Sequence, residues 1–198
     1  MVNCGVAKFV LPEEDECGDC HLISCYKNGV LIAAIDGIGH GKEAAKAAKT
    51  AISVLKERAS DPITSLVERC HERLREMRGV VLSLASIHAS DGVMAWLGVG
   101  NVQGVLMRAD STQRNVREPL LLRAGVVGSQ LPQLRPTILP IARGDTVYFA
   151  TDGVRSAFSE TLTALENPQK AADRILRQFQ SGKDDALVLV TRLVAMCP

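Results

Sequence analysis

The chain has 198 residues and a formal net charge of +1, with 46% apolar and 23% charged residues. This length favours a single domain with a sizeable core, which we predict to span residues 1–198. The near-neutral charge argues against a nucleic-acid-binding domain, which usually carries a strongly basic face. No stretch approaches the ~20 apolar residues of a membrane helix, and the first ten residues lack a signal-peptide pattern. We therefore expect a cytoplasmic protein.

Apolar periodicity predicts the elements in chain order. A short apolar strand is expected at 29–35, followed by two helices at 41–59 and 62–77. Asp61 is expected to cap the second helix, with Pro62 at its first position. Further strands are predicted at 80–88, 93–99, 102–107 and 146–150, then a helix at 167–180 and a last strand at 186–193.

Strands and helices are therefore segregated along the chain, which favours an α+β fold over a parallel α/β sheet. The two consecutive helices are expected to pack as a hairpin on one face of a sheet. Asp91-Gly92 and Gly100-Asn101 are expected to be the turns of a strand meander, since Asp-Gly is a strong hairpin signal.

Three acidic turns lie at the ends of apolar strands. Asp36-Gly37 and Asp152-Gly153 each follow such a strand, and Asp184 comes just before the last one. A carboxylate just beyond a buried strand is held at the sheet edge, and a neighbouring glycine lets a metal or phosphate approach the backbone.

Carboxylate oxygens are the ligands that Mn²⁺ and Mg²⁺ prefer. Several carboxylates can share two such ions about 3.5–4 Å apart, which turns a bound water into a nucleophile near neutral pH. The ions also offset the charge that develops on a phosphoryl group. This pattern predicts metal-dependent phosphoryl hydrolysis without a serine, cysteine or histidine nucleophile.

The order and spacing of these motifs resemble those of the PPM (PP2C-like) protein phosphatases over nearly the whole chain. The motifs are Gly18-Asp19, Asp36-Gly37-Ile38-Gly39-His40-Gly41, Gly98-Val99-Gly100-Asn101, the segment from Arg143 to Val154, and Asp184-Asp185. Within this family, the compact chain is similar to the SpoIIE-type bacterial branch and its small stressosome feedback phosphatases.

The resemblance implies a four-layer αββα sandwich with two central antiparallel sheets and the metals in the cleft between them. It implies a serine/threonine phosphatase with a stress-response feedback role. The substrates would be phosphoserine and phosphothreonine on STAS-domain partners of a stressosome, of the RsbR and RsbS type. A metal-activated water would attack phosphorus in line, and neither nucleic acid nor membrane would be a partner.

Carried over by position, Asp36 would bridge the two ions and the Gly37 carbonyl would bind one of them. Asp152 and Asp184 would bind the other ion. Asp19 would act mainly through metal-bound water.

Two further positions would support these ligands. Asp185 matches a place that is often Asn, so its expected role is to orient rather than to ligate, and Gly153 supports the turn after Asp152. The His that follows the first Asp-Gly in animal members is Ile38 here, so the general acid is not identified. Lys183 and Arg155 are the candidates for binding substrate phosphate.

Plainer interpretations remain open for several of these residues. Asp-Gly pairs are common in turns, and His40 would be a solvent-facing residue at a helix start. The cluster of Cys17, Cys20, His21 and Cys25 could bind zinc or act in redox chemistry, although chance thiols are the favoured interpretation. A non-catalytic binding module of the same fold and a metal-dependent small-molecule phosphohydrolase are the rival functions.

Overall fold

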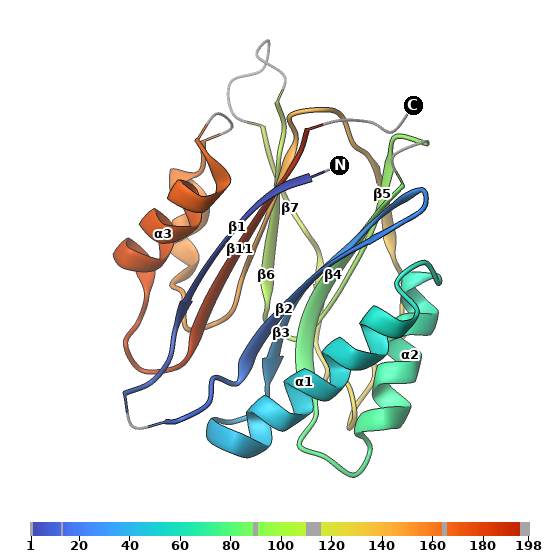
Figure 1. Ribbon diagram of the computed structural model, residues 1–198, viewed down its shortest axis with the longest axis vertical. Coiled ribbons are helices and arrows are strands. Elements are labelled where there is room, and N and C mark those ends of the chain that lie inside the picture. The colour runs from blue at the N-terminus through green and yellow to red at the C-terminus, as the bar shows by residue number, and fades with distance from the viewer. Residues whose placement is uncertain (1, 13, 89–90, 110–115, 164–165, 195–198) are drawn as a thin grey trace.

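The computed structural model describes residues 2–12, 14–88, 91–109, 116–163 and 166–194 (Figure 1). Its helical segments are α1 (Gly41–Glu57), α2 (Ile63–Leu74), the short 3-10 helix η1 (Ser156–Thr161) and α3 (Pro168–Phe179). Its strands are β1 (Val2–Phe9), β2 (Asp19–Tyr26), β3 (Gly29–Gly37), β4 (Val80–His88), β5 (Val93–Val99), β6 (Gln103–Met107), β7 (Arg117–Pro119), β8 (Leu122–Arg123), β9 (Thr137–Pro140), β10 (Thr146–Ala150) and β11 (Ala186–Leu193). No helix among these residues is long and apolar enough to cross a membrane.

The strands form two sheets. The first sheet has the order β2-β3-β4-β5-β8, with β9 also paired to β5, and the second has the order β1-β11-β10-β6-β7. Every pairing is antiparallel except the short one between β5 and β8. The first and last strands of the chain, β1 and β11, are paired along their full length in the second sheet.

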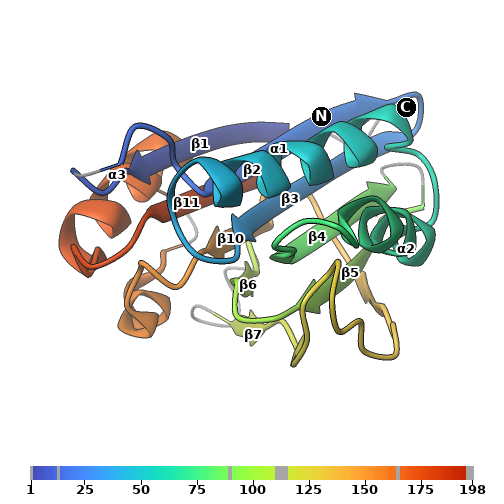
Figure 2. The ribbon, with the colours of Figure 1, turned by 90° about the horizontal axis from the view of Figure 1, so that it is seen from below.

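The two sheets lie between helical layers (Figure 2). Helices α1 and α2 pack on the first sheet, and α3 packs on β1 and β11 of the second sheet. Three clusters of buried apolar residues fill the three interfaces between the layers. The middle cluster joins the sheets through large side chains such as Trp96 and Phe149, which are at most 1% exposed. The predicted αββα sandwich is therefore confirmed.

Most predicted elements occur within a few residues of their expected bounds. The hairpin of α1 and α2 on one sheet face is confirmed. The predicted helix at 167–180 is α3, whose N-cap Asn167 accepts hydrogen bonds from the N–H groups of Gln169 and Lys170. Strands β1 and β2, and the short strands β7, β8 and β9, were not predicted.

The expected meander is wrong in its last step. Strands β4 and β5 pair as a hairpin, but β6 belongs to the second sheet, where it pairs with β10. The turn at Gly100-Asn101 therefore carries the chain from one sheet to the other. A turn signal marks a change of direction in the sequence but does not indicate which strand the chain pairs with next.

The predicted cap of α2 is also wrong. Pro62 is itself the N-cap residue, and no side chain caps the helix. Asp61 instead lies 3.9 Å from the Arg69 guanidinium in an ion pair. Pro62 retains a role at the helix start, because its carbonyl accepts the N–H of Leu66.

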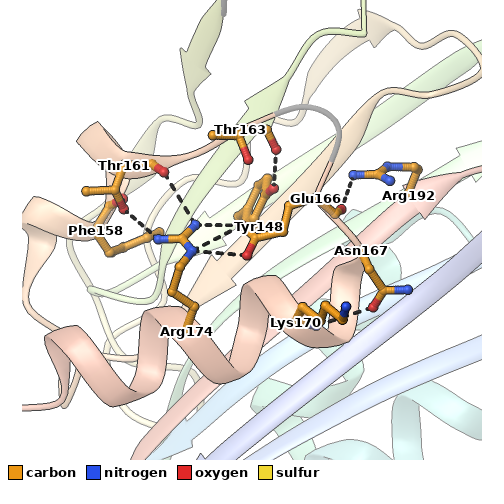
Figure 3. A network of polar contacts seen from close by, with 9 residues as sticks. All are labelled: Tyr148, Phe158, Thr161, Thr163, Glu166, Asn167, Lys170, Arg174 and Arg192. Carbon is orange, nitrogen blue, oxygen red and sulfur yellow. Dashed lines mark hydrogen bonds and ion pairs between the residues drawn. The ribbon is translucent and has the colours of Figure 1, made fainter.

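A network of polar contacts fastens α3 and the segment before it to the second sheet (Figure 3). Nε of Arg174 lies 3.1 Å from each carboxylate oxygen of Glu166, and the same guanidinium reaches the hydroxyl and carbonyl of Thr161. Arg192 of β11 donates to the Glu166 carbonyl at 2.6 Å. Arg174 therefore joins α3, the end of η1 and the loop between them.

Replacing Arg174 with Ala should destabilise the fold by about 1–2 kcal/mol, because a half-buried carboxylate loses its only multidentate partner among the described residues. The unfolding midpoint in urea measures this loss. Arg177→Ala serves as the control, since Arg177 is exposed on the same helix. Equal midpoints for the two variants would contradict the importance of the network.

Candidate active site

Two of the predicted acidic residues stand side by side in the first sheet. Asp19 begins β2, Asp36 lies near the end of β3, and the two are direct partners in the antiparallel pairing. Asp19 is 2% exposed. Like charges placed directly opposite on paired strands repel each other, so this pair needs a cation or a proton to neutralise it.

The second sheet provides the other two carboxylates. Asp152 follows β10 and Asp184 precedes β11, and these two strands are neighbours in the sheet. Asp152 accepts a hydrogen bond from the Asn101 side-chain amide at 2.8 Å. Asp184 accepts one from the backbone N–H of Asp185 at 2.8 Å. Acidic residues from both sheets therefore meet at one edge of the sandwich.

A cleft of 530 Å³ opens at this edge, and we call it the acidic cleft. Its walls include Asp36, Asp152 and Asp184, together with Asn101 and Lys183. Asp19 and Gly37 lie next to these residues in sequence or in the sheet but do not line the cleft. The structure thus brings the predicted carboxylates together, with Asp19 set deeper than the rest.

The charges of the cluster act strongly on one another. Burial and the neighbouring carboxylates, foremost Asp19, raise the pKa of Asp36 to about 8. Burial also raises the pKa of Asp19 to about 7, although a hydrogen bond from Thr151 opposes this shift. Burial raises the pKa of Asp184 as well. A site that disfavours its own negative charge to this extent is suited to bind cations.

Thr151 links the buried Asp19 to the second sheet. Its hydroxyl, 1% exposed, donates to a carboxylate oxygen of Asp19 at 2.6 Å and accepts the N–H of Leu187 at 2.8 Å. The ammonium group of Lys8 donates to the Asp19 carbonyl at 2.9 Å. Asp19 is therefore held by Lys8 of β1 and by Thr151, the residue after β10, which is itself bonded to β11.

Asp185 holds the loop that leads into β2. Its side chain is buried, and its two oxygens accept the N–H of Leu11 at 2.9 Å and the N–H of Gly18 at 2.7 Å. The Gly18 carbonyl in turn accepts the N–H of Gly37 at 3.1 Å. These contacts support the orienting role that the sequence predicts for Asp185.

The two predicted glycines allow close packing around the carboxylates. A β-carbon on Gly37 would lie 2.2 Å from the Ala44 carbonyl oxygen of α1, and one on Gly153 would lie 1.9 Å from the Asp185 carbonyl oxygen. Any side chain at either position would push a carboxylate-bearing turn out of place.

The donor set fits hard divalent cations. All candidate ligands are oxygens, as Mn²⁺ and Mg²⁺ require. The Asp36 carboxylate accepts no hydrogen bond from the described residues, so its oxygens are available. Within the described ranges, no three His, Cys, Asp or Glu side chains are gathered as ligands of one ion. Asp152 and Asp184 each accept a hydrogen bond from an N–H group instead.

The candidates for binding substrate phosphate differ in position. Lys183 lines the acidic cleft. Arg155 does not, because its guanidinium donates to the Gln178 carbonyl at 2.6 Å and lies 5.9 Å from the centre of the Phe179 ring. Arg155 thus binds the C-terminal end of α3. The nearness of Arg155 to Asp152 in sequence does not predict that its side chain points to α3.

The predicted solvent-facing position of His40 is confirmed. His40 is the N-cap residue of α1, its side chain is 67% exposed, and its ring is hydrogen-bonded to Glu14. Both His40 and Ile38 line the acidic cleft. Ile38, which stands where animal members have the His, thus lines the cleft with an aliphatic side chain.

The cysteine cluster behaves as free thiols. Cys17, Cys20 and Cys25 form no disulfide, and no metal-ligating group of three is found among the described residues. Burial raises the pKa of Cys17 to about 12 and also raises the pKa of Cys20. A reactive cysteine needs a stabilised thiolate, and burial disfavours the thiolate of Cys17 and Cys20.

Two residues of the site were missed as functional positions. Thr151 lies in the motif segment from Arg143 to Val154 and Asn101 in a predicted turn, but the sequence predicts no role in the site for either side chain. Both are side chains that can form hydrogen bonds and that lie just beyond the end of a strand. Thr151 directly precedes Asp152 in sequence, and Asn101 lies across from it.

The raised pKa values predict how the metal-free protein responds to pH. Asp36 and Asp19 titrate at about 8 and about 7 in the fold, against about 3.9 when unfolded. Their protonated forms thus favour the fold, so stability is greatest below about pH 4 for these two groups and is lost as pH rises to about 8. Thermal melts in EDTA across this range should show the decline, and Asp36→Asn should flatten it. An equal slope in the variant would exclude Asp36 as its source.

Thr151 can be tested by a pair of substitutions. Thr151→Ala removes the donor to Asp19 and leaves the buried N–H of Leu187 without an acceptor, which should cost about 1–3 kcal/mol of stability and weaken Mn²⁺ binding about tenfold or more. Thr151→Ser keeps the hydroxyl and should retain both properties. Urea unfolding and calorimetric titration with Mn²⁺ measure them; equal metal affinity in the Ala and Ser variants would contradict the positioning role.

Comparison with known proteins places this geometry in a family. The sequence model described as Stage II sporulation protein E (SpoIIE) matches residues 26–194. The phosphoserine phosphatase RsbX of Bacillus subtilis (strain 168) is 27% identical over 178 residues, covering 89% of this chain and 87% of that protein.

Solved structures share the fold over nearly the full length. A chain from the bacterial stressosome, a modular system adapted to control secondary messenger signalling, has a TM-score of 0.87 at 24% identity, covering 97% of this chain and 100% of its own. RsbX in complex with magnesium has a TM-score of 0.85 at 19% identity, covering 97% and 95%. The Mycobacterium tuberculosis serine/threonine phosphatase PstP/Ppp has a TM-score of 0.75 at 14% identity, covering 98% and 99%.

These matches confirm the resemblance to PPM phosphatases and to the SpoIIE-type branch with its RsbX-like members. The family model covers most of the chain, including the motifs of Asp36, Asp152 and Asp184. The chain belongs to the SpoIIE family.

Proposed function

We propose that this protein is a metal-dependent serine/threonine phosphatase that removes phosphate from phosphoserine and phosphothreonine of partner proteins. The observation that carries the proposal is the acidic cleft, where carboxylates from both sheets of a PPM-type sandwich meet. The relative named as a phosphoserine phosphatase supports the same chemistry. The cofactors would be two Mn²⁺ or Mg²⁺ ions, and the magnesium complex of RsbX supports this choice.

Each carboxylate has a distinct task in this proposal. Asp36 would hold both ions, with the Gly37 carbonyl on one and with Asp152 and Asp184 on the other. Asp19 would orient water beside them. When bound, the ions supply the Lewis acidity that activates water and offsets charge on the phosphoryl group.

The remaining residues of the cleft orient the site and the substrate. Asn101 holds one oxygen of Asp152 at 2.8 Å, which leaves the other oxygen of that carboxylate for a cation. Lys183 lines the cleft and would contact an oxygen of the substrate phosphoryl group. Because Ile38 cannot donate a proton, the leaving oxygen would be protonated by water.

The proposed substrates are phosphorylated STAS-domain proteins of a stressosome, of the RsbR and RsbS type, in a stress-response feedback role. The similarity to RsbX and to the stressosome chain supports this assignment. Surfaces around the acidic cleft would recognise the partner.

The central test measures turnover of a small aryl phosphate with Mn²⁺, with Mg²⁺ and with EDTA. Wild-type protein should be active only with metal, and Asp36→Asn should lower the rate about 100-fold or more, because one carboxylate would hold both ions. Asp173→Asn, an exposed carboxylate on α3, should retain wild-type activity.

The rival functions give different outcomes in the same assay. A folded wild-type protein with no turnover, on aryl phosphate or on phosphorylated STAS domains, would favour a non-catalytic binding module. Faster hydrolysis of nucleotides than of phosphopeptides would favour a small-molecule phosphohydrolase. Equal rates for wild type and Asp36→Asn would mean that the reaction takes place elsewhere.

A further inference from the structure

An arginine lies against the loop that forms one wall of the acidic cleft. Arg78 is an exposed residue in the connection between α2 and β4. A β-carbon built on Gly39 would lie 2.6 Å from an Nη atom of Arg78 and 3.8 Å from its Cζ. The guanidinium therefore rests over Gly39, which itself lines the cleft.

The backbone on either side of Arg78 is fixed relative to the cleft. The Gly79 carbonyl accepts the N–H of Ile38 at 3.1 Å, which ties the α2–β4 connection to the loop after Asp36. The next residue, Val80, exchanges two backbone hydrogen bonds with Val127, each 2.9 Å long. The position of Arg78 at the rim is thus set by main-chain contacts and does not depend on its own side chain.

The charge of Arg78 is not used within the described part of the fold. The neighbouring arginines Arg69 and Arg75 pair with Asp61 and Glu72, whereas no described carboxylate pairs with Arg78. The residue is exposed, so its guanidinium donors can be reached from solvent. An arginine fixed at the rim of a cleft with unused donors is suited to bind an external anion, since its planar fork matches carboxylate geometry.

The position of Arg78 favours an anion on the polypeptide of the substrate over its phosphoryl group. The carboxylates that would hold the ions line the cleft, and Lys183 lines it with them, but Arg78 does not. A phosphoryl group at the ions would lie among those lining residues. The chain that carries the phosphorylated residue must then leave the cleft across its rim, and Arg78 is exposed on the side of the rim that Gly39 forms.

We infer that Arg78 is a specificity-determining residue, which binds an acidic side chain next to the phosphorylated residue of a protein substrate. The inference rests on the proposed phosphatase function and adds the chemistry by which the substrate is chosen. An exposed ion pair of this kind contributes up to about 1 kcal/mol, which corresponds to about a fivefold preference. The preference should weaken as salt is added.

The test compares two phosphoserine peptides that differ only in their flanks, Asp and Glu in one and Asn and Gln in the other. Wild-type protein should hydrolyse the acidic peptide with about fivefold higher kcat/KM, mainly through a lower KM. Arg78→Gln should reduce this ratio to about 1, and Arg78→Lys should keep part of it. Arg58→Gln, a substitution of an exposed arginine at the far end of α1, should retain the full ratio.

Other outcomes would overturn the inference. A ratio that Arg78→Gln leaves intact would exclude Arg78 as the reader of the flank. An equal loss on both peptides and on aryl phosphate would mean that Arg78 supports the site or contacts the phosphoryl group, and not the flank.

A binding measurement separates this inference from the proposed function. Fluorescence anisotropy of the two peptides in the presence of Mg²⁺ should show the same preference and its loss in Arg78→Gln, even in a protein without turnover. If the protein binds the acidic peptide more tightly but shows no turnover, the phosphatase function is refuted and the role of Arg78 stands. Turnover without any preference, in either assay, would refute the role of Arg78 alone.

Discussion

The repulsion between Asp19 and Asp36 is the constraint around which the rest of the structure is arranged. The two residues are direct partners across β2 and β3, where like charges destabilise a strand pair. The fold keeps them together through contacts from the other sheet, chiefly the hydroxyl of Thr151 on Asp19. Because burial raises the pKa of both carboxyls, either protons or cations must neutralise them. The energy that packs the sandwich therefore maintains a site with a strong demand for positive charge.

The four-layer architecture explains how so few strand ends can assemble this site. Asp36 lies near the end of a strand of the first sheet, while Asp152 and Asp184 flank neighbouring strands of the second sheet. The apolar cluster between the sheets fixes their separation, because well-packed interiors yield little. At the same edge, the chain passes from the first sheet to the second at Asn101, whose side chain binds Asp152. One turn thus connects the layers and orients a carboxylate.

Sequence patterns predicted what is encoded locally and missed what depends on pairing. Buried strands such as β4 and β11 are predominantly apolar, and α1 and α2 keep a helical period. Strands β1 and β2 were missed because they lie at the sheet edges, where polar residues interrupt the pattern. The cluster of carboxylates could be predicted from strand ends and family motifs. The direction of Arg155 could not, because its partners are carbonyls at the end of a helix that lies over 20 residues away in sequence.

Asp185 shows why a fifth carboxylate can stay in such a crowded site. Its two oxygens each accept a separate backbone N–H, from Leu11 and from Gly18. An asparagine has a single acceptor oxygen and would turn its amide group toward one of these donors, leaving one of the two N–H groups unsatisfied. The charge of Asp185 contributes to the raised pKa values of Asp19 and Asp36. The same side chain thus secures the loop before Asp19 and adds to the negative potential that favours cations in the cleft.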